Sequence, residues 1–296
     1  MKRVLIAGAT GYLGRYLCAE YRRRGWHVTA LVRKKSARTD LVADAIIKAE
    51  VTAPETLHGT MSGIDLVVSA LGITRQADGL GYWDVDYQAN VNLLEEALRS
   101  HVAHFAFVHV LNADRMEHVP LVAAKAAFVR KLQAADLQST IIAPTGYFSD
   151  MGDFLNMAKA GRVWLFGTGQ FRINPIHGAD LATAVFDAVE TGTSWADIGG
   201  PETFTHDEVA QLCFEALTKP PRITHLPDSL RRMALWMLPR VAPQRIAGPA
   251  QFFLTAGAMN MTVPATGTRK LAEHFKSQTD PSRKSAADTE STGVRS

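Results

Sequence analysis

The chain has 296 residues, of which 47% are apolar and 21% charged, and its formal net charge is only +3. This composition excludes a mostly disordered or fibrous chain. The two cysteines, Cys18 and Cys213, exclude a disulfide framework and a cysteine-rich metal site. The weak basic excess gives no reason to expect nucleic acid binding. No apolar run approaches the roughly 18 residues of a membrane span, so we expect a cytoplasmic protein without a transmembrane segment.

Short apolar runs alternate with amphipathic stretches through the first half of the chain. A continuous apolar run such as Val4 to Ala7 is typical of a strand that is buried on both faces. Strands that alternate with helices predict an α/β fold, with a doubly wound parallel sheet covered on both faces. The expected strands are 4–7, 28–32, 66–71, 105–110 and 139–143, and the expected helices are 12–24, 90–99 and 123–135.

The pattern becomes irregular after Gly146. Helices are expected over 179–190, with Asp180 favourably placed near the start, and over 207–217, opened by Thr205. Seven prolines between 220 and 264 are expected to break the remainder into short pieces. We therefore predict one domain over 1–276, with a small C-terminal lobe made mainly of 146–178 and 199–276. The polar end, 277–296, is predicted to be a disordered tail.

A glycine-rich loop directly follows the first predicted strand and opens the first predicted helix. Glycines let the chain turn tightly there, and they let phosphate groups approach the N-terminus of the helix. A strand before the loop and a helix after it are the context that such a phosphate-binding loop requires. The predicted cofactor-binding residues of this loop are Gly8, Thr10, Gly11, Tyr12, Leu13 and Gly14.

The Gly-x-x-Gly-x-x-Gly spacing, with Thr10 inside it, resembles the loop of the short-chain dehydrogenase/reductase superfamily. Segments 69–72, 86–94, 144–148 and 175–182 resemble later landmarks of its atypical, extended-like members. The nearest subgroup includes divinyl chlorophyllide reductase-like and nitrogen-regulator-like proteins. This resemblance implies a Rossmann-type fold, with a substrate lobe over the carboxyl ends of the strands. It also implies cofactor contacts from Ala70, Leu71, Gly72 and Pro144.

Charge at the end of the second predicted strand indicates which cofactor is preferred. An acidic side chain there usually holds the 2′-hydroxyl of NAD, whereas a basic one accommodates the 2′-phosphate of NADP. Here the strand runs into Arg33, Lys34 and Lys35, and the next carboxylate is Asp40. A planar guanidinium suits a phosphate. We therefore expect NADPH as the preferred cofactor, with Arg33 as its phosphate contact and NAD as the alternative.

The sequence departs from the superfamily at the catalytic positions. The usual serine, tyrosine and lysine correspond here to His109, Leu121 and Lys125, so only the lysine is kept. The resemblance implies that Lys125 contacts the cofactor ribose. A proton donor in place of the tyrosine needs a group near the substrate with a suitable pKa, and Lys125, His109 and Tyr147 are the candidates. His177 is more plausible as a structural hydrogen-bonding residue.

The function that these features favour is an NADPH-dependent oxidoreductase, which transfers hydride to a carbonyl or an activated double bond of an organic substrate. A non-catalytic NADP(H)-binding redox sensor or assembly protein is the first alternative, and a sugar-nucleotide-type epimerase the second. The scattered histidines predict no metal site. The apolar and basic segment 230–238 is either a helix that caps the substrate cleft, which we favour, or a membrane-surface helix. As a lid it would suit a hydrophobic substrate.

Overall fold

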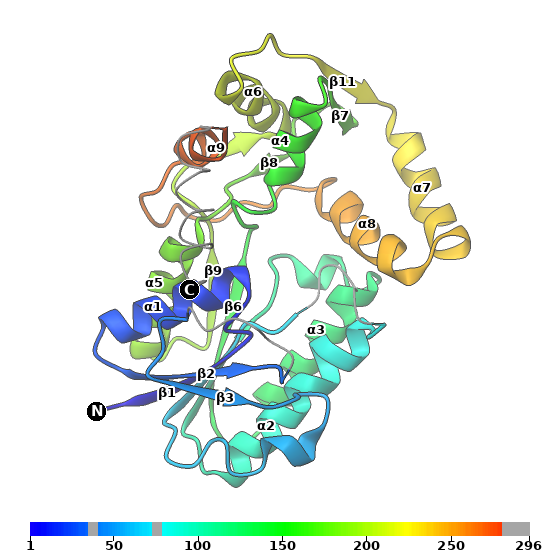
Figure 1. Cartoon of the computed structure of the whole chain (residues 1–296). Helices are drawn as coiled ribbons and strands as arrows, with labels where there is room; N and C mark the ends of the chain where they lie inside the picture. Colours follow the sequence, from blue (N-terminus) through cyan, green and yellow to red (C-terminus); the bar gives the residue numbers. More distant parts are fainter. Residues whose placement is uncertain (35–40, 73–78, 280–296) are drawn as a thin grey trace, which may run out of the picture.

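The computed structural model describes residues 1–34, 41–72 and 79–279. Its centre is a seven-stranded sheet in the order β3-β2-β1-β4-β5-β6-β9, in which every neighbouring pair is parallel (Figure 1). The predicted doubly wound parallel sheet is thereby confirmed. Its strands are β1 (Arg3–Ala7), β2 (His27–Val32), β3 (Ala45–Lys48), β4 (Leu66–Ser69), β5 (His104–Val108), β6 (Gln138–Pro144) and β9 (Trp195–Ile198).

Both faces of the sheet are covered because its central strands are apolar on both sides. Every residue of β4 and β5 is buried. On one face, α1 (Tyr12–Arg23) and α5 (Gly178–Glu190) pack on the alternate side chains of β1, β2 and β4. On the other face lie α2 (Asn90–Arg99) and α3 (Pro120–Gln133), around Phe105, Phe107 and Phe128.

A second core lies above the carboxyl edge of the sheet (Figure 1). It is built by α4 (Gly152–Lys159), α6 (His206–Ala216) and α9 (Leu271–Thr279), with Phe148, Phe214 and Phe275 fully buried. Two small sheets complete it: parallel β7 (Val163–Phe166) with β11 (Ile223–Leu226), and antiparallel β8 (Arg172–Ile173) with β10 (Phe204–Thr205). Helix α9 includes 277–279, and the rest of the predicted tail, 280–296, lies outside the described residues.

Two helices form a hairpin at the outer edge of the molecule: α7 (Asp228–Val241) and α8 (Gln244–Ala256) (Figure 1). The expectation that prolines break this region into short pieces is wrong, because Pro239 and Pro249 lie inside these helices. A proline removes one N–H donor and crowds the preceding turn. Pro239 is exposed and lies in the last turn of α7, so little of the helix depends on the lost bond.

Candidate functional site

The strand order of the large sheet reverses between β1 and β4, and loops from both strands meet there. Gly8 follows β1 with φ +81°, and a Cβ at this position would lie 2.8 Å from the carbonyl oxygen of Ala70, which follows β4. Only glycine combines this conformation with so close an approach. In doubly wound folds ligands bind in the crevice at this reversal, so the predicted loop residues and Ala70, Leu71 and Gly72 lie at the expected edge.

The N-terminus of α1 suits a phosphate. Gly11 is the N-cap residue, no side chain caps the helix, and no acidic residue lies in the first turn. The first backbone N–H groups of a helix have no partner within the helix, and together with its dipole they favour an anion. Gly14 lets the helix start close to the loop, because a Cβ there would lie 2.1 Å from the carbonyl oxygen of Gly8. These features fit a dinucleotide pyrophosphate.

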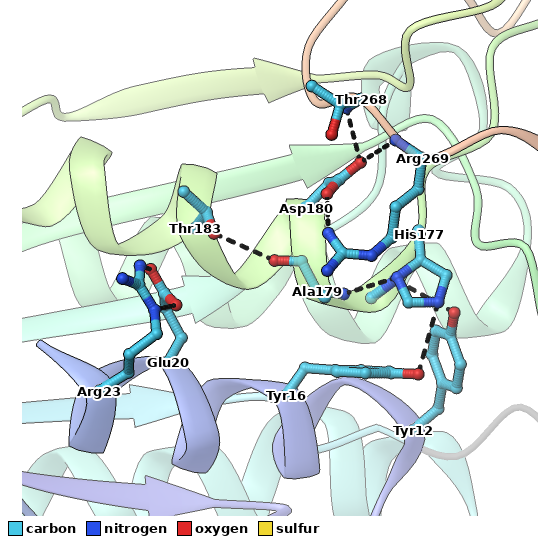
Figure 2. Close-up of polar contacts among 11 residues, drawn as sticks. Tyr12, Tyr16, Glu20, Arg23, His177, Ala179, Asp180, Thr183, Thr268 and Arg269 are labelled. Atoms are coloured by element: carbon cyan, nitrogen blue, oxygen red, sulfur yellow. Dashed lines mark hydrogen bonds and ion pairs between the residues drawn. The ribbon is translucent and has the colours of Figure 1, made fainter.

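The side chain of Tyr12 joins α1 to α5 (Figure 2). Its hydroxyl accepts a hydrogen bond from the Gly178 N–H at 3.1 Å, and burial raises its pKa to about 12. Next to it, His177 caps α5: Nδ1 accepts from the Ala179 N–H at 3.1 Å, and Nε2 lies 3.5 Å from the Tyr16 hydroxyl. His177 therefore has a structural hydrogen-bonding role, as expected.

Asp180 ties the same end of α5 to the chain that leads into α9 (Figure 2). Its Oδ2 accepts the backbone N–H groups of Thr268 and Arg269 at 2.9 and 2.8 Å, and the Arg269 guanidinium pairs with Oδ1. These bonds to Arg269 and Thr268 outweigh the effect of burial and hold the pKa of Asp180 below its usual value. The N-terminus of α5 is thus occupied by protein contacts.

Lys125, on α3, carries its ammonium group to the carboxyl ends of β4 and β5. Nζ lies 3.3 Å from Oδ1 of Asp86 and donates to the carbonyl oxygens of Val108 and Leu71 at 3.1 and 3.4 Å. The Asp86 side chain is fully buried and that of Lys125 is 12% exposed. Separating such a buried pair would leave an uncompensated charge, which is costly. Asp86 therefore holds the ammonium group in position.

Asp86 was not among the site residues predicted from the sequence. It belongs to the π-helix η2 (Trp83–Ala89), a rare helix type that is frequent at functional sites. A Cβ on Gly72 would lie 2.8 Å from Oδ1 of Asp86 and 3.0 Å from Nζ of Lys125. Glycine at this position therefore leaves room for the pair. The available signal was that Asp86 opens the segment 86–94, which resembles a family landmark, but its partner lies on a different helix.

His109 lies directly after β5 and is buried, with 5% of its surface exposed. Burial, reinforced by the charges of Lys125 and Arg130, lowers its pKa to about 3. The imidazole is therefore neutral near pH 7 and holds no imidazolium proton to donate.

Tyr147 follows β6, and its ring lies 5.8 Å from that of Tyr12. Burial first, and then the charge of Asp150, raise the pKa of its hydroxyl. The phenol therefore stays protonated and can donate a hydrogen bond.

A cavity of about 410 Å³ separates the carboxyl edge of the sheet from the second core. On the sheet side it is lined by Ala70, Leu71, Gly72, Lys125 and Pro144, together with His109, Tyr147 and Asp86. The opposite walls are mainly apolar, with Phe154 and Met157 from α4, Trp164 from β7, and Phe252 and Phe253 from α8. Asp153, His206 and Arg231 also line the cavity. The structure thus brings all three candidate proton donors to one apolar cavity, which suits a small organic ligand.

Arg33 lies apart from this cavity, immediately after β2, and is exposed. Lys35 of the predicted basic turn lies outside the described residues. In the described part of the chain, no three His, Cys, Asp or Glu side chains gather as a metal ion would require. Across the same residues, no helix is both long and apolar enough to cross a membrane.

Comparison with known families decides the class of this fold. Residues 8–192 match the sequence pattern of the NAD(P)H-binding family. The chain belongs to this family. Its glycine loop, strand β4 and Lys125 all lie within the matched region, which begins directly after β1.

Two curated relatives carry different names. A divinyl chlorophyllide a 8-vinyl-reductase from Zea mays is 28% identical over 265 residues, covering 81% of this chain and 65% of that protein. The chain therefore spans less than two thirds of that relative. A photosystem II assembly factor from Guillardia theta is 28% identical over 235 residues, covering 77% of this chain and 74% of that protein. The resemblance noted from the sequence is confirmed by the reductase relatives.

Solved structures agree on the fold. An NADPH-dependent quinone oxidoreductase from Escherichia coli, solved with NADPH, superposes with a TM-score of 0.73 at 17% identity, covering 94% of this chain and all (100%) of that one. A nucleoside-diphosphate-sugar epimerase from Staphylococcus aureus also gives 0.73 at 17% identity, with 93% and 100% coverage. At these identities the likeness shows a shared Rossmann-type architecture.

Proposed function

We propose that the protein is an NADPH-dependent oxidoreductase that reduces a carbonyl or an activated double bond of an organic substrate. One observation carries this proposal. The Lys125 ammonium group is held by Asp86 and two backbone carbonyls where the cofactor crevice meets the apolar cavity. A fixed charge with transferable protons at such a junction serves both to bind a cofactor and to protonate a substrate.

The residues that would hold the cofactor follow from the geometry of the crevice. The first-turn N–H groups of α1, reached through Gly8, Thr10, Gly11, Tyr12, Leu13 and Gly14, would bind the pyrophosphate. Ala70, Leu71, Gly72 and Pro144 would line the rest, with Lys125 on the ribose. Arg33, basic and exposed after β2, supports NADPH over NADH. When bound, the cofactor supplies the hydride.

In this proposal, Nζ of Lys125 donates the proton that the reduced substrate takes up. The neutral imidazole of His109 has a pKa of about 3, and the phenol of Tyr147 has a raised pKa, so neither is tuned to release a proton near pH 7. Both still offer hydrogen bonds that orient a substrate oxygen. Lys125 would transfer a proton to the oxygen or carbon that becomes basic, and water would reprotonate it. The mainly apolar walls favour a small-molecule substrate with a hydrophobic body.

Two measurements test this function. Calorimetric titration with NADPH and NADH is expected to show binding of both, tighter for NADPH. Stopped-flow oxidation of NADPH is then followed over a panel of quinones, aldehydes and conjugated alkenes, with the wild type and Lys125→Met. The control is Lys131→Met, an exposed lysine on the same helix. We expect turnover to fall roughly 100-fold or more in Lys125→Met, the scale of a lost general acid. If the protein binds neither NADPH nor NADH, the whole assignment is wrong.

The second candidate is an NADP(H)-binding sensor or assembly protein without turnover. Leu121, buried where the superfamily has tyrosine, supports it, as do the relatives named as assembly factors. Tight NADPH binding without oxidation of any substrate in the panel would favour this candidate. The third, an epimerase, is disfavoured because the tyrosine is missing. For each of these candidate functions we propose that the protein acts in the cytoplasm.

A further inference from the structure

The outer face of α7 carries an unusual stripe of exposed apolar residues. Leu230, Met233, Met237 and Val241 are 39%, 51%, 40% and 71% exposed. They recur every three or four residues and therefore lie along one face of the helix. Trp236 beside them is 62% exposed, and no residue of α7 is buried. Contiguous exposed apolar side chains of this kind mark an interaction surface.

The opposite face of α7 explains why this stripe points outward. Arg231, Leu235 and Leu238 are half-buried, and Arg231 donates to the Leu254 carbonyl oxygen of α8 at 3.2 Å. The Asp228 carboxylate holds the same guanidinium at 2.6 Å. The helix is thus fixed to the protein by its inner face. Figure 1 shows α7 at the edge of the molecule.

The charge of the hairpin identifies the kind of occupant. Residues 228–246 contain four arginines and one aspartate, a net charge of +3 that equals the formal net charge of the whole chain. Arg232 and Arg240 are exposed on α7, and the Arg240 guanidinium lies 4.6 Å from the centre of the Trp236 ring. Apolar residues with tryptophan and arginine on an amphipathic helix are suited to the boundary between headgroups and acyl chains.

We propose that the exposed surface of α7 docks on an anionic lipid bilayer surface, through the apolar stripe of Leu230, Met233, Met237 and Val241 and the exposed Trp236, Arg232 and Arg240 beside it. A second copy of this chain fits less well, because a symmetric contact would bring the arginines of both copies together. Near an anionic membrane each of these arginines is attracted instead. This inference is independent of the proposed catalytic activity. It departs from the sequence-based preference for a helix that only caps the cleft.

The test is co-sedimentation of the full chain with vesicles, either of phosphatidylcholine alone or of phosphatidylcholine and phosphatidylglycerol in equal parts. The wild type is expected to bind the anionic vesicles and to be released by salt. Arg232→Gln with Arg240→Gln should weaken binding to anionic vesicles by roughly 25-fold, about fivefold per arginine. Met233→Gln, Trp236→Gln and Met237→Gln combined should weaken it at least about tenfold.

Two matched controls should leave binding unchanged: Lys219→Gln with Arg222→Gln, exposed cations outside the hairpin, and Trp83→Gln, an exposed tryptophan on η2. Circular dichroism verifies the fold of every variant. Absence of binding to anionic vesicles, or binding that both hairpin variants retain, overturns the proposal and leaves an acidic protein as the occupant. A dimer in light scattering that the apolar triple variant converts to a monomer also overturns it.

Discussion

Apolar residues are placed in opposite ways in the central strands of the sheet and in the α7–α8 hairpin. Every residue of β4 and β5 is buried, whereas α7 contains leucine, methionine, tryptophan and valine and buries none of them. Around the sheet, close packing fixes the elements α3 and η2 and thereby the positions of Lys125 and Asp86. In the hairpin, the outer side chains are exposed, so we expect them to contribute little to the stability of the fold. Four variants probe this difference.

Replacing Asp86 with alanine should have the largest effect on stability. The change leaves the Lys125 ammonium group, 12% exposed, without its carboxylate, which costs about 3–5 kcal/mol when a buried pair is broken. Urea unfolding measures the loss, with Asp136→Ala, an exposed aspartate, as the control. Asp86→Leu combined with Lys125→Met should recover most of it, because no buried charge remains. An unchanged unfolding free energy for Asp86→Ala would mean that the pair is not held in solution.

Gly14→Ala should come next. The new Cβ would lie 2.1 Å from the Gly8 carbonyl oxygen, a backbone atom that cannot swing aside. Overpacking of this kind costs about 3 kcal/mol, and it displaces the helix start that suits a phosphate. We therefore expect a lower midpoint of thermal unfolding and a lower affinity for the dinucleotide in calorimetric titration. Gly152→Ala, where a Cβ has no neighbour within 4 Å, is the matched control and should be neutral. Tight dinucleotide binding by Gly14→Ala would place the cofactor elsewhere.

The central strands of the large sheet could be predicted from the sequence, because each is a short apolar run followed by an amphipathic helix. The strand Ala45–Lys48 was missed because it is only four residues long and lies at the edge of the sheet, where none of its residues is fully buried. The cofactor loop was recognisable because Gly8 to Gly14 is contiguous. The pair of Asp86 with Lys125 was not, because it depends on how two helices pack. The exposure of α7 was equally hidden, since an amphipathic pattern does not say which face is covered.

A smaller, pH-dependent effect is expected from His109. Its pKa of about 3 in the folded protein lies below the ordinary histidine value of 6.5. Between these values the unfolded chain binds more protons, so stability falls as the pH drops from 6.5 towards 3. His109→Leu removes this contribution. It should reduce the loss of unfolding free energy between pH 7 and pH 5 by about 2 kcal/mol. Urea unfolding at both pH values measures it, and an equal loss in the variant would show that the imidazole is solvated.

Trp236→Ala should change stability least, although it removes the largest side chain from α7. Trp236 is 62% exposed, and surface substitutions usually change the unfolding free energy by less than about 0.5 kcal/mol. Phe107→Ala, in fully buried β5, is the matched contrast and should cost about 3–5 kcal/mol. Both values come from the same urea titration. A loss of several kcal/mol for Trp236→Ala would mean that the outer face of α7 is already covered in the isolated protein. A small loss is the result expected if that face is uncovered in the isolated protein, as docking on a bilayer requires.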